Sequence, residues 1–174
     1  FLFPAVRITA PTLVEGRDFR RLSVEEGKGA YRFKTLVPIT YKFSEAVLIP
    51  PTRRAFIAND VEWARLSPKS LTITEGYAWN GSSPKKGIRV FGKDVWIGTP
   101  DFPATLPASL IHDVMFQFSA LSAMPFTLAQ ANDFYRQICD QFGFRLTGAY
   151  YGALKDFSAP YWGVRNGYLT SIDL

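Results

Sequence analysis

The sequence predicts an α+β fold, in which short antiparallel strands in the N-terminal part are followed by about three C-terminal helices packed on them. Before residue 103, short apolar or alternating runs are broken by Gly, Pro and Asn, whereas after it apolar residues recur with helical spacing. Strands followed by helices are typical of a sheet covered on one side. With 174 residues, 47% of them hydrophobic, the chain can build one core. We expect a single domain over residues 31–174, preceded by an N-terminal arm, 1–30, that orders on a partner.

Alternation of large or branched residues with smaller or polar ones predicts the strands. Pro38 interrupts the first alternating stretch and indicates a bent or peripheral strand. A Gly92-Lys93-Asp94 turn between two apolar runs predicts a hairpin. The strands are expected at 31–37, 39–43 and 71–74, and the hairpin joins 88–91 to 95–97.

Three segments show the apolar stripe of a helix. The first, 107–121, has Pro107 in its first turn and a stripe of Ile111, Val114, Met115 and Phe118. The second, 127–142, has Thr127 as N-cap and ends before Gly143. In the third, 146–157, several small residues predict close approach of another element. The tail from residue 160 is aromatic and lacks helical periodicity.

Charge and cysteine content exclude several classes of protein. The net charge of +5 comes from 20 basic and 15 acidic residues spread along the chain, so a nucleic-acid partner is not expected. No apolar run approaches the roughly 20 residues of a membrane span. A lone Cys139 excludes an internal disulfide and a cysteine-based zinc cluster.

His112, the only histidine, is followed by Asp113 in the first predicted helix. At about 100° per residue, His112 lies at the edge of the buried face and Asp113 points further outward. The pair could supply a general base near neutral pH, or it could be a locally hydrogen-bonded structural pair. Asn132 takes the same boundary position on the second helix and is the better-placed partner for His112. Asp133 falls on the polar face, where an ion pair with Arg136 is expected.

The segment 76–84 has the sequence Gly-Tyr-Ala-Trp-Asn-Gly-Ser-Ser-Pro, which demands a special backbone path. It could bind an anion or a cation through backbone groups and the Asn80 amide, or it could be a tight loop anchored by Trp79. Asp101, further along, could cap the first helix or approach this loop, and the cap is favoured.

Three of these segments, in this order, resemble a phage- and prophage-encoded family of unknown function. Its pattern is a Gly-Phe/Tyr-x-Trp/Thr-Asp-Gly-Ala-Ser-x-Pro loop, a Leu-Ile-His-Asp helix and an Ala-Asp-x-x-Phe helix. The matching segments are 76–84, 108–113 and 131–135, followed by the stop at Gly143. The resemblance covers residues 70–160.

The two helices are more remotely similar to those of calcium-dependent secreted and parvoviral phospholipases. This resemblance implies His112 as the base, Asp113 as a calcium ligand, and carbonyl groups around Asn80 and Gly81 as further ligands. It also implies Asn132, less readily Asp133, as the group that orients the imidazole. The sequence departs from the pattern because Asn80 and Asn132 replace carboxylates, and Phe116 replaces the tyrosine of the phospholipases. A neutral amide cannot stabilise an imidazolium as a carboxylate does.

Two classes of function remain open. The first is a bacteriophage virion-associated structural or interaction protein, a tail or capsid component made in the host cytoplasm. It would bind other virion proteins in a larger assembly and keep a degenerate His-Asp site. The second is a calcium-assisted ester or phospholipid hydrolase with His112 as general base. The candidate interaction residues are Phe1, Phe3, Tyr161, Trp162 and Tyr168.

Overall fold

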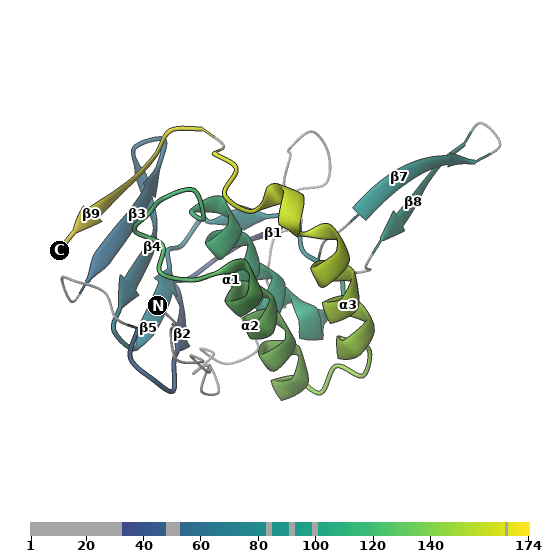
Figure 1. Ribbon diagram of the computed structural model, residues 1–174, viewed down its shortest axis with the longest axis horizontal. Helices are drawn as coiled ribbons and strands as arrows, with labels where there is room; N and C mark the ends of the chain where they lie inside the picture. The colour runs from purple at the N-terminus through teal and green to yellow at the C-terminus, as the bar shows by residue number, and fades with distance from the viewer. Residues whose placement is uncertain (1–32, 48–52, 83–84, 91–92, 99–100, 166) are drawn as a thin grey trace.

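The computed structural model has strands in its N-terminal part and three α-helices in its C-terminal part, which confirms the α+β class (Figure 1). It describes residues 33–47, 53–82, 85–90, 93–98, 101–165 and 167–174, with only the backbone of 85–90 and 93–98. The strands are β1 (Phe33–Lys34), β2 (Ile39–Lys42), β3 (Arg54–Ala58), β4 (Val61–Ser67), β5 (Ser70–Ile73), β6 (Ala78–Trp79), β7 (Lys85–Val90), β8 (Lys93–Gly98) and β9 (Leu169–Asp173). The helices are α1 (Leu106–Gln117), α2 (Leu128–Gln141) and α3 (Thr147–Phe157), with 3₁₀ turns η2 (Pro103–Thr105) and η3 (Ala159–Tyr161).

The main sheet has five strands in the order β2-β5-β4-β3-β9, and all neighbours are antiparallel. The last strand, β9, therefore crosses back from the helical part to form one edge of a sheet built from the N-terminal part (Figure 1). β1 pairs with β6, and β7 pairs with β8, as separate two-stranded sheets.

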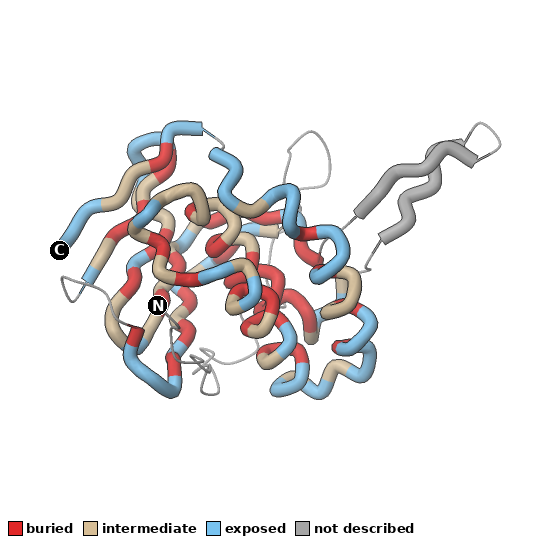
Figure 2. Tube along the Cα trace, viewed as in Figure 1, coloured by how far each residue is buried: buried red, intermediate tan, exposed pale blue. Residues whose placement is uncertain are grey.

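The core lies between this sheet and the helices, where buried residues face one another (Figure 2). The predicted stripe of α1 is fully buried. Helix α2 begins as predicted, because the Thr127 hydroxyl accepts from the Gln130 N–H at 3.2 Å and the Gln130 side chain accepts from the Thr127 N–H at 2.9 Å. The largest fully buried side chains are Trp79, Tyr41, Tyr135, Phe56, Phe118 and Phe134.

Tyr41 joins the sheet to the first helix. Its hydroxyl donates to the Pro107 carbonyl at 2.7 Å, and its side chain is fully buried. Burial raises the pKa of Tyr41 well above its ordinary value, so the hydroxyl keeps the proton that it donates. This bond fixes the start of α1, and so the position of His112, relative to β2.

Several predicted elements are confirmed, and others are wrong. All three helices and the 85–98 hairpin are present. In the first predicted strand, however, Lys34 is the last strand residue, because Thr35 bonds through its backbone and its hydroxyl to the turn at residues 74–77. The prediction that another element packs closely against the small residues of α3 is also wrong. A Cβ added at Gly148 or Gly152 would meet nothing within 4 Å.

Three strands of the main sheet were not predicted. β3 and β4 form a hairpin whose turn residues, Asn59 and Asp60, have φ values of 49° and 63°. Both torsions are typical of the turn that suits the twist of a hairpin, so the Asn-Asp pair was a usable signal. β9 lies in the aromatic tail, for which the sequence predicted no regular element. It is a strand because β3, far away in the sequence, supplies its hydrogen-bonding partner.

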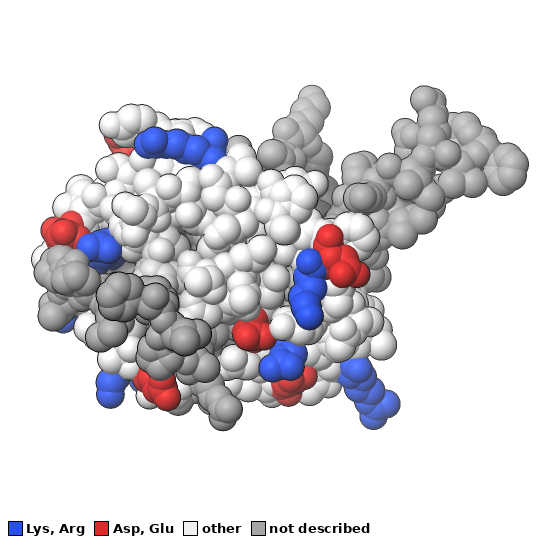
Figure 3. Space-filling model, viewed as in Figure 1, with Lys and Arg blue, Asp and Glu red and all other residues white. Residues whose placement is uncertain are grey.

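The described helices include none with the length and apolar character needed to cross a membrane. On the face drawn in Figure 3, the basic side chains are dispersed and lie among acidic ones. This arrangement is consistent with the dispersed charge of the sequence.

Tyr41→Phe should lower the free energy of unfolding by about 1–2 kcal/mol, because the buried Pro107 carbonyl loses its donor. Urea denaturation would measure the change. Tyr161→Phe is the matched control, since Tyr161 is 65% exposed and should change stability by less than about 0.5 kcal/mol. Equal stability of the two variants would contradict a role for Tyr41 in holding α1.

Candidate functional site

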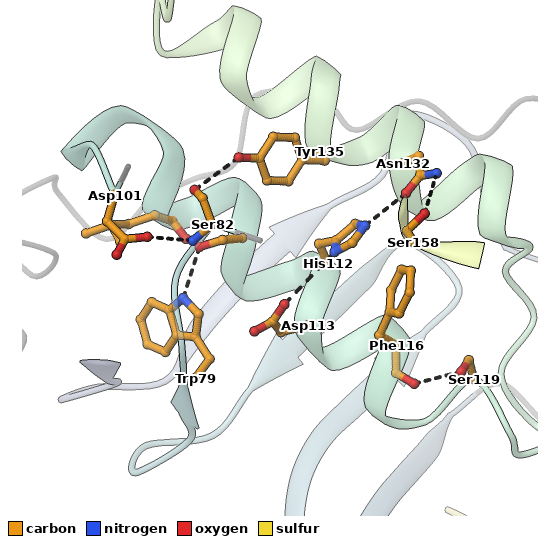
Figure 4. A network of polar contacts seen from close by, with 12 residues as sticks. Trp79, Ser82, Asp101, His112, Asp113, Phe116, Ser119, Asn132, Tyr135 and Ser158 are labelled. Atoms are coloured by element: carbon orange, nitrogen blue, oxygen red, sulfur yellow. Dashed lines mark hydrogen bonds and ion pairs between the residues drawn. The ribbon is translucent and has the colours of Figure 1, made fainter. Parts of the chain in front are cut away.

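The sequence-predicted pair of His112 and Asn132 comes together where α1 packs on α2 (Figure 4). The imidazole Nε2 lies 2.9 Å from the Asn132 Oδ1. Asn132 in turn donates from Nδ2 to the Ser158 hydroxyl at 3.3 Å. Since the amide nitrogen is engaged by Ser158, the amide oxygen faces His112 and must accept from a protonated Nε2.

The imidazole is enclosed by aromatic rings. His112 is only 5% exposed and Asn132 only 4%. The Phe116 ring stacks on the imidazole with centroids 4.3 Å apart, and Tyr135 approaches edge-on at 5.7 Å. Trp162 packs edge-on against Phe116 and extends this aromatic cover. The ring is therefore held by packing on its faces and by an amide at Nε2.

Asp113 lies on the other side of the imidazole. Its Oδ1 is 4.0 Å from the His112 Nδ1, and its side chain is 27% exposed. Because the Nε2–H donates to the Asn132 oxygen, an uncharged imidazole held in this way carries its lone pair on Nδ1, on the side of Asp113. The predicted orientation, with Asp113 further out than His112, is confirmed.

The Gly76 segment is anchored against the helices by its own side chains. Trp79 is 1% exposed and donates from Nε1 to the Ser109 hydroxyl of α1 at 3.0 Å. Ser82 is fully buried, donates to the Thr105 hydroxyl at 2.8 Å and accepts from the Tyr135 hydroxyl at 3.1 Å. These bonds support the interpretation of the segment as a tight loop anchored by Trp79.

Asp101 stabilises this loop and does not cap the first helix. Its Oδ1 accepts from the Ser82 N–H at 2.7 Å, whereas the N-cap residues of η2 and α1 are Phe102 and Thr105. The favoured helix cap is therefore wrong, and the alternative, that Asp101 approaches the loop, is confirmed. Gly81 has a φ of +77°, and a Cβ there would collide with the Asp101 carboxylate and the Phe33 ring. Glycine is required at this position for close packing.

Tyr135 connects the loop to the His112 pair, since it contacts the imidazole and bonds to Ser82. Burial, with a smaller contribution from Cys139, raises the pKa of Tyr135 far above its ordinary range. Burial raises the pKa of the Cys139 thiol from 9.0 to about 12, opposed by a hydrogen bond with Tyr135. Both groups therefore stay protonated near neutral pH and serve as structural contacts.

The described residues do not fit a calcium ion at this site. They contain no group of three or more His, Cys, Asp or Glu side chains that could hold a metal. Of the residues implied as ligands, Asp113 is the single carboxylate, Asn80 is exposed and Gly81 is buried under Asp101. Calcium takes about 6–8 oxygen ligands, usually including several carboxylates.

Asp133 lies apart from the imidazole, on the polar side of α2. It accepts from the Tyr151 hydroxyl at 2.8 Å, and Arg136 lies over the Tyr151 ring at 5.1 Å. This hydrogen bond is the largest cause of the raised pKa of Tyr151. Arg136 therefore contacts the tyrosine that binds Asp133. The three side chains form a surface cluster, whereas the sequence predicted an ion pair between Asp133 and Arg136.

The predicted interaction residues differ in exposure. Tyr161 and Tyr168 are each 65% exposed, whereas Trp162 is partly buried against Phe116. Phe1 and Phe3 lie outside the described residues.

Sequence reasoning missed Ser158 and Ser82, which complete the two hydrogen-bonded networks. Only the Ser-Ser pair of the loop could have drawn attention to Ser82, and nothing in the sequence singles out Ser158.

No protein-family model matches the chain, and no curated protein or solved structure is significantly similar to it. The resemblance to the phage family and to the phospholipases therefore stays a prediction.

Asn132→Ala should lower the free energy of unfolding by about 2–3 kcal/mol, because it leaves the His112 N–H and the Ser158 hydroxyl without their partner in a buried site. Thermal or urea denaturation would measure the loss. The neighbouring Asp133→Ala is the control and should cost less than about 1 kcal/mol, since its bond to Tyr151 is half-exposed. A loss no larger than that of the control would contradict the tight pairing.

Cys139 should resist thiol reagents in the folded protein at pH 8 and react at once after unfolding. Its raised pKa adds stability that is fully present below pH 9.0 and is lost progressively as the pH rises toward about 12. Labelling kinetics followed across this range would show acceleration in step with loss of structure. Rapid labelling of the native protein at pH 8 would contradict the buried position.

Proposed function

We propose that the chain is a non-catalytic interaction protein of a bacteriophage particle, in which the His-Asp site has become a structural element. The observation that carries this proposal is the enclosure of His112, which is 5% exposed, stacked on Phe116 and bonded to an amide. The resemblance of residues 70–160 to a phage-encoded family is the reason for proposing a bacteriophage particle as the assembly.

Two physical arguments support loss of catalysis. A general base must be within hydrogen-bond reach of the proton that it removes, and the burial of His112 among Phe116 and Tyr135, with 5% of it exposed, limits that approach. Asn132 holds the Nε2–H tautomer but carries no charge to stabilise an imidazolium. His112 and Asn132 instead join α1 to α2 by a buried hydrogen bond.

The molecule also presents apolar groups suited to a partner. Several large apolar residues between the last residue of α3 and the residue after β9 are exposed. Exposed apolar surface of this kind is typical of contact with another protein. They are Phe157, Tyr161, Val164, Tyr168, Ile172 and Leu174.

The proposal predicts that the protein is found in mature particles. Virions from the phage or induced prophage that encodes it should be purified on a density gradient and analysed by mass spectrometry. The chain should co-sediment with the particles at a constant ratio to the major capsid protein through a second gradient. A chain left entirely in the host lysate, with none in washed particles, would contradict the virion role.

A second candidate, an ester or phospholipid hydrolase, is favoured by one observation. Asn132 accepts from the Nε2–H, which leaves Nδ1, beside the partly exposed Asp113, as the nitrogen that could take a proton. In this candidate, His112 would take a proton from water at Nδ1 while Asn132 held the ring.

An ester and phospholipid panel, run with and without calcium, separates the two candidates. Wild type and His112→Gln, compared at temperatures where both are folded, should be equally inactive if the site is structural. Asn132→Asp serves as a gain-of-function control, because it restores the orienting carboxylate. Turnover by wild type that His112→Gln abolishes would overturn the non-catalytic proposal.

A further inference from the structure

The outer edge of β9 carries backbone groups directed away from the sheet. The Asn59 N–H bonds to the Tyr168 carbonyl at 3.0 Å, and the Leu174 N–H bonds to the Arg53 carbonyl at 3.2 Å. Both bonds place even-numbered residues of this segment toward β3. Because successive residues of a strand alternate in direction, Leu169, Ser171 and Asp173 direct their N–H and C=O groups outward.

Arg165 confirms this direction at one end of the strand. Its Nη2 donates to the Leu169 carbonyl at 2.9 Å, a group that β3 does not use. The guanidinium therefore lies beside the outer edge of β9 at Leu169. At the other end, the Asp173 side chain bonds to Arg54 at 2.8 Å and is still 57% exposed.

This edge is complementary to itself. An antiparallel copy of β9 centred on Ser171 would exchange two backbone hydrogen bonds between the two Ser171 residues. The same register places Asp173 of one copy opposite Leu169 of the other. Its N–H would share the Leu169 carbonyl with Arg165, and its carboxylate would lie next to the Arg165 guanidinium. Opposite charges would meet twice, once on each side of the two-fold axis.

The even-numbered residues, whose side chains lie on the opposite face of β9, also form favourable pairs in this register. Ile172 is 51% exposed and would lie opposite Thr170 of the second copy. Two β-branched side chains directly opposite one another are a favourable cross-strand pair. At the far end of the strand, Leu174, 53% exposed, would lie opposite Tyr168.

We propose that two copies of the chain join through β9, which extends the five-stranded sheet of one copy into that of the other. The occupant of the edge is a second copy because Arg165 and Asp173 are placed as each other's partners by the two-fold register. Self-pairing deepens the proposed function, since it names one partner for the same interaction surface.

Light scattering after size-exclusion chromatography of the full chain tests the proposal, and wild type should be a dimer. Ser171→Pro should be a monomer, because proline removes an outward N–H and leaves the bonds to β3 intact. Thr40→Pro is the matched control, since β2 is the opposite edge of the sheet and Thr40 also directs its backbone outward. It should remain a dimer.

Cysteine cross-linking tests the register itself. Two Ser171→Cys chains would meet at the axis, where hydrogen-bonded partners have Cα atoms about 5.5 Å apart, within disulfide range. Mild oxidation should therefore give a covalent dimer. Leu174→Cys is the control beside the same strand. It should not cross-link, because Leu174 of one copy lies opposite Tyr168 of the other, six residues from the second Leu174.

A wild-type monomer at all concentrations would overturn the proposal, and so would a dimer that survives Ser171→Pro and resists Ser171→Cys cross-linking. The result also separates this proposal from the virion role. A dimer that is absent from particles would overturn the virion role alone, and a monomer found in particles would overturn self-pairing alone.

Discussion

The hydrogen bond between His112 and Asn132 is the contact on which the arrangement of the helical layer depends. It lies where α1 packs on α2, and Asn132 carries it on to Ser158 at the end of α3. Three helices thus meet through one buried polar chain. A single such bond contributes about 1 kcal/mol net, but a buried partner left without it costs about 1–3 kcal/mol. The main contribution of the pair is therefore to specify which faces of the helices meet. Its net contribution to stability is small.

The same constraint sets the surroundings of the imidazole. The imidazole is oriented at Nε2, and Asp113 lies on its Nδ1 side. Yet Phe116 covers its face, and a neutral amide stands where a charge would be needed for catalysis. A second network, from Tyr135 through Ser82 to Thr105, anchors the Gly76 loop to the same helices. Loop and helices are thereby fixed together.

Local patterns predicted the helices and the pairing of His112 with Asn132, because helical periodicity places both residues at the boundary of an apolar stripe. The Gly92 turn likewise predicted its hairpin. β9 could not be predicted, since its partner β3 lies more than a hundred residues earlier and local periodicity carries no record of that pairing. Asp101 was misassigned for a similar reason: its partner, the Ser82 N–H, is close in space but not in sequence. Tertiary contacts decided each of these outcomes.

The most direct test of this account is the reaction of His112 with diethyl pyrocarbonate, which acylates accessible imidazoles. The chain contains one histidine, so mass spectrometry reads a single site. The account predicts that the folded protein is not modified over a period in which the urea-unfolded chain is fully modified. Modification of the folded protein at the rate of a free imidazole would show an accessible base and would contradict the structural role of the pair.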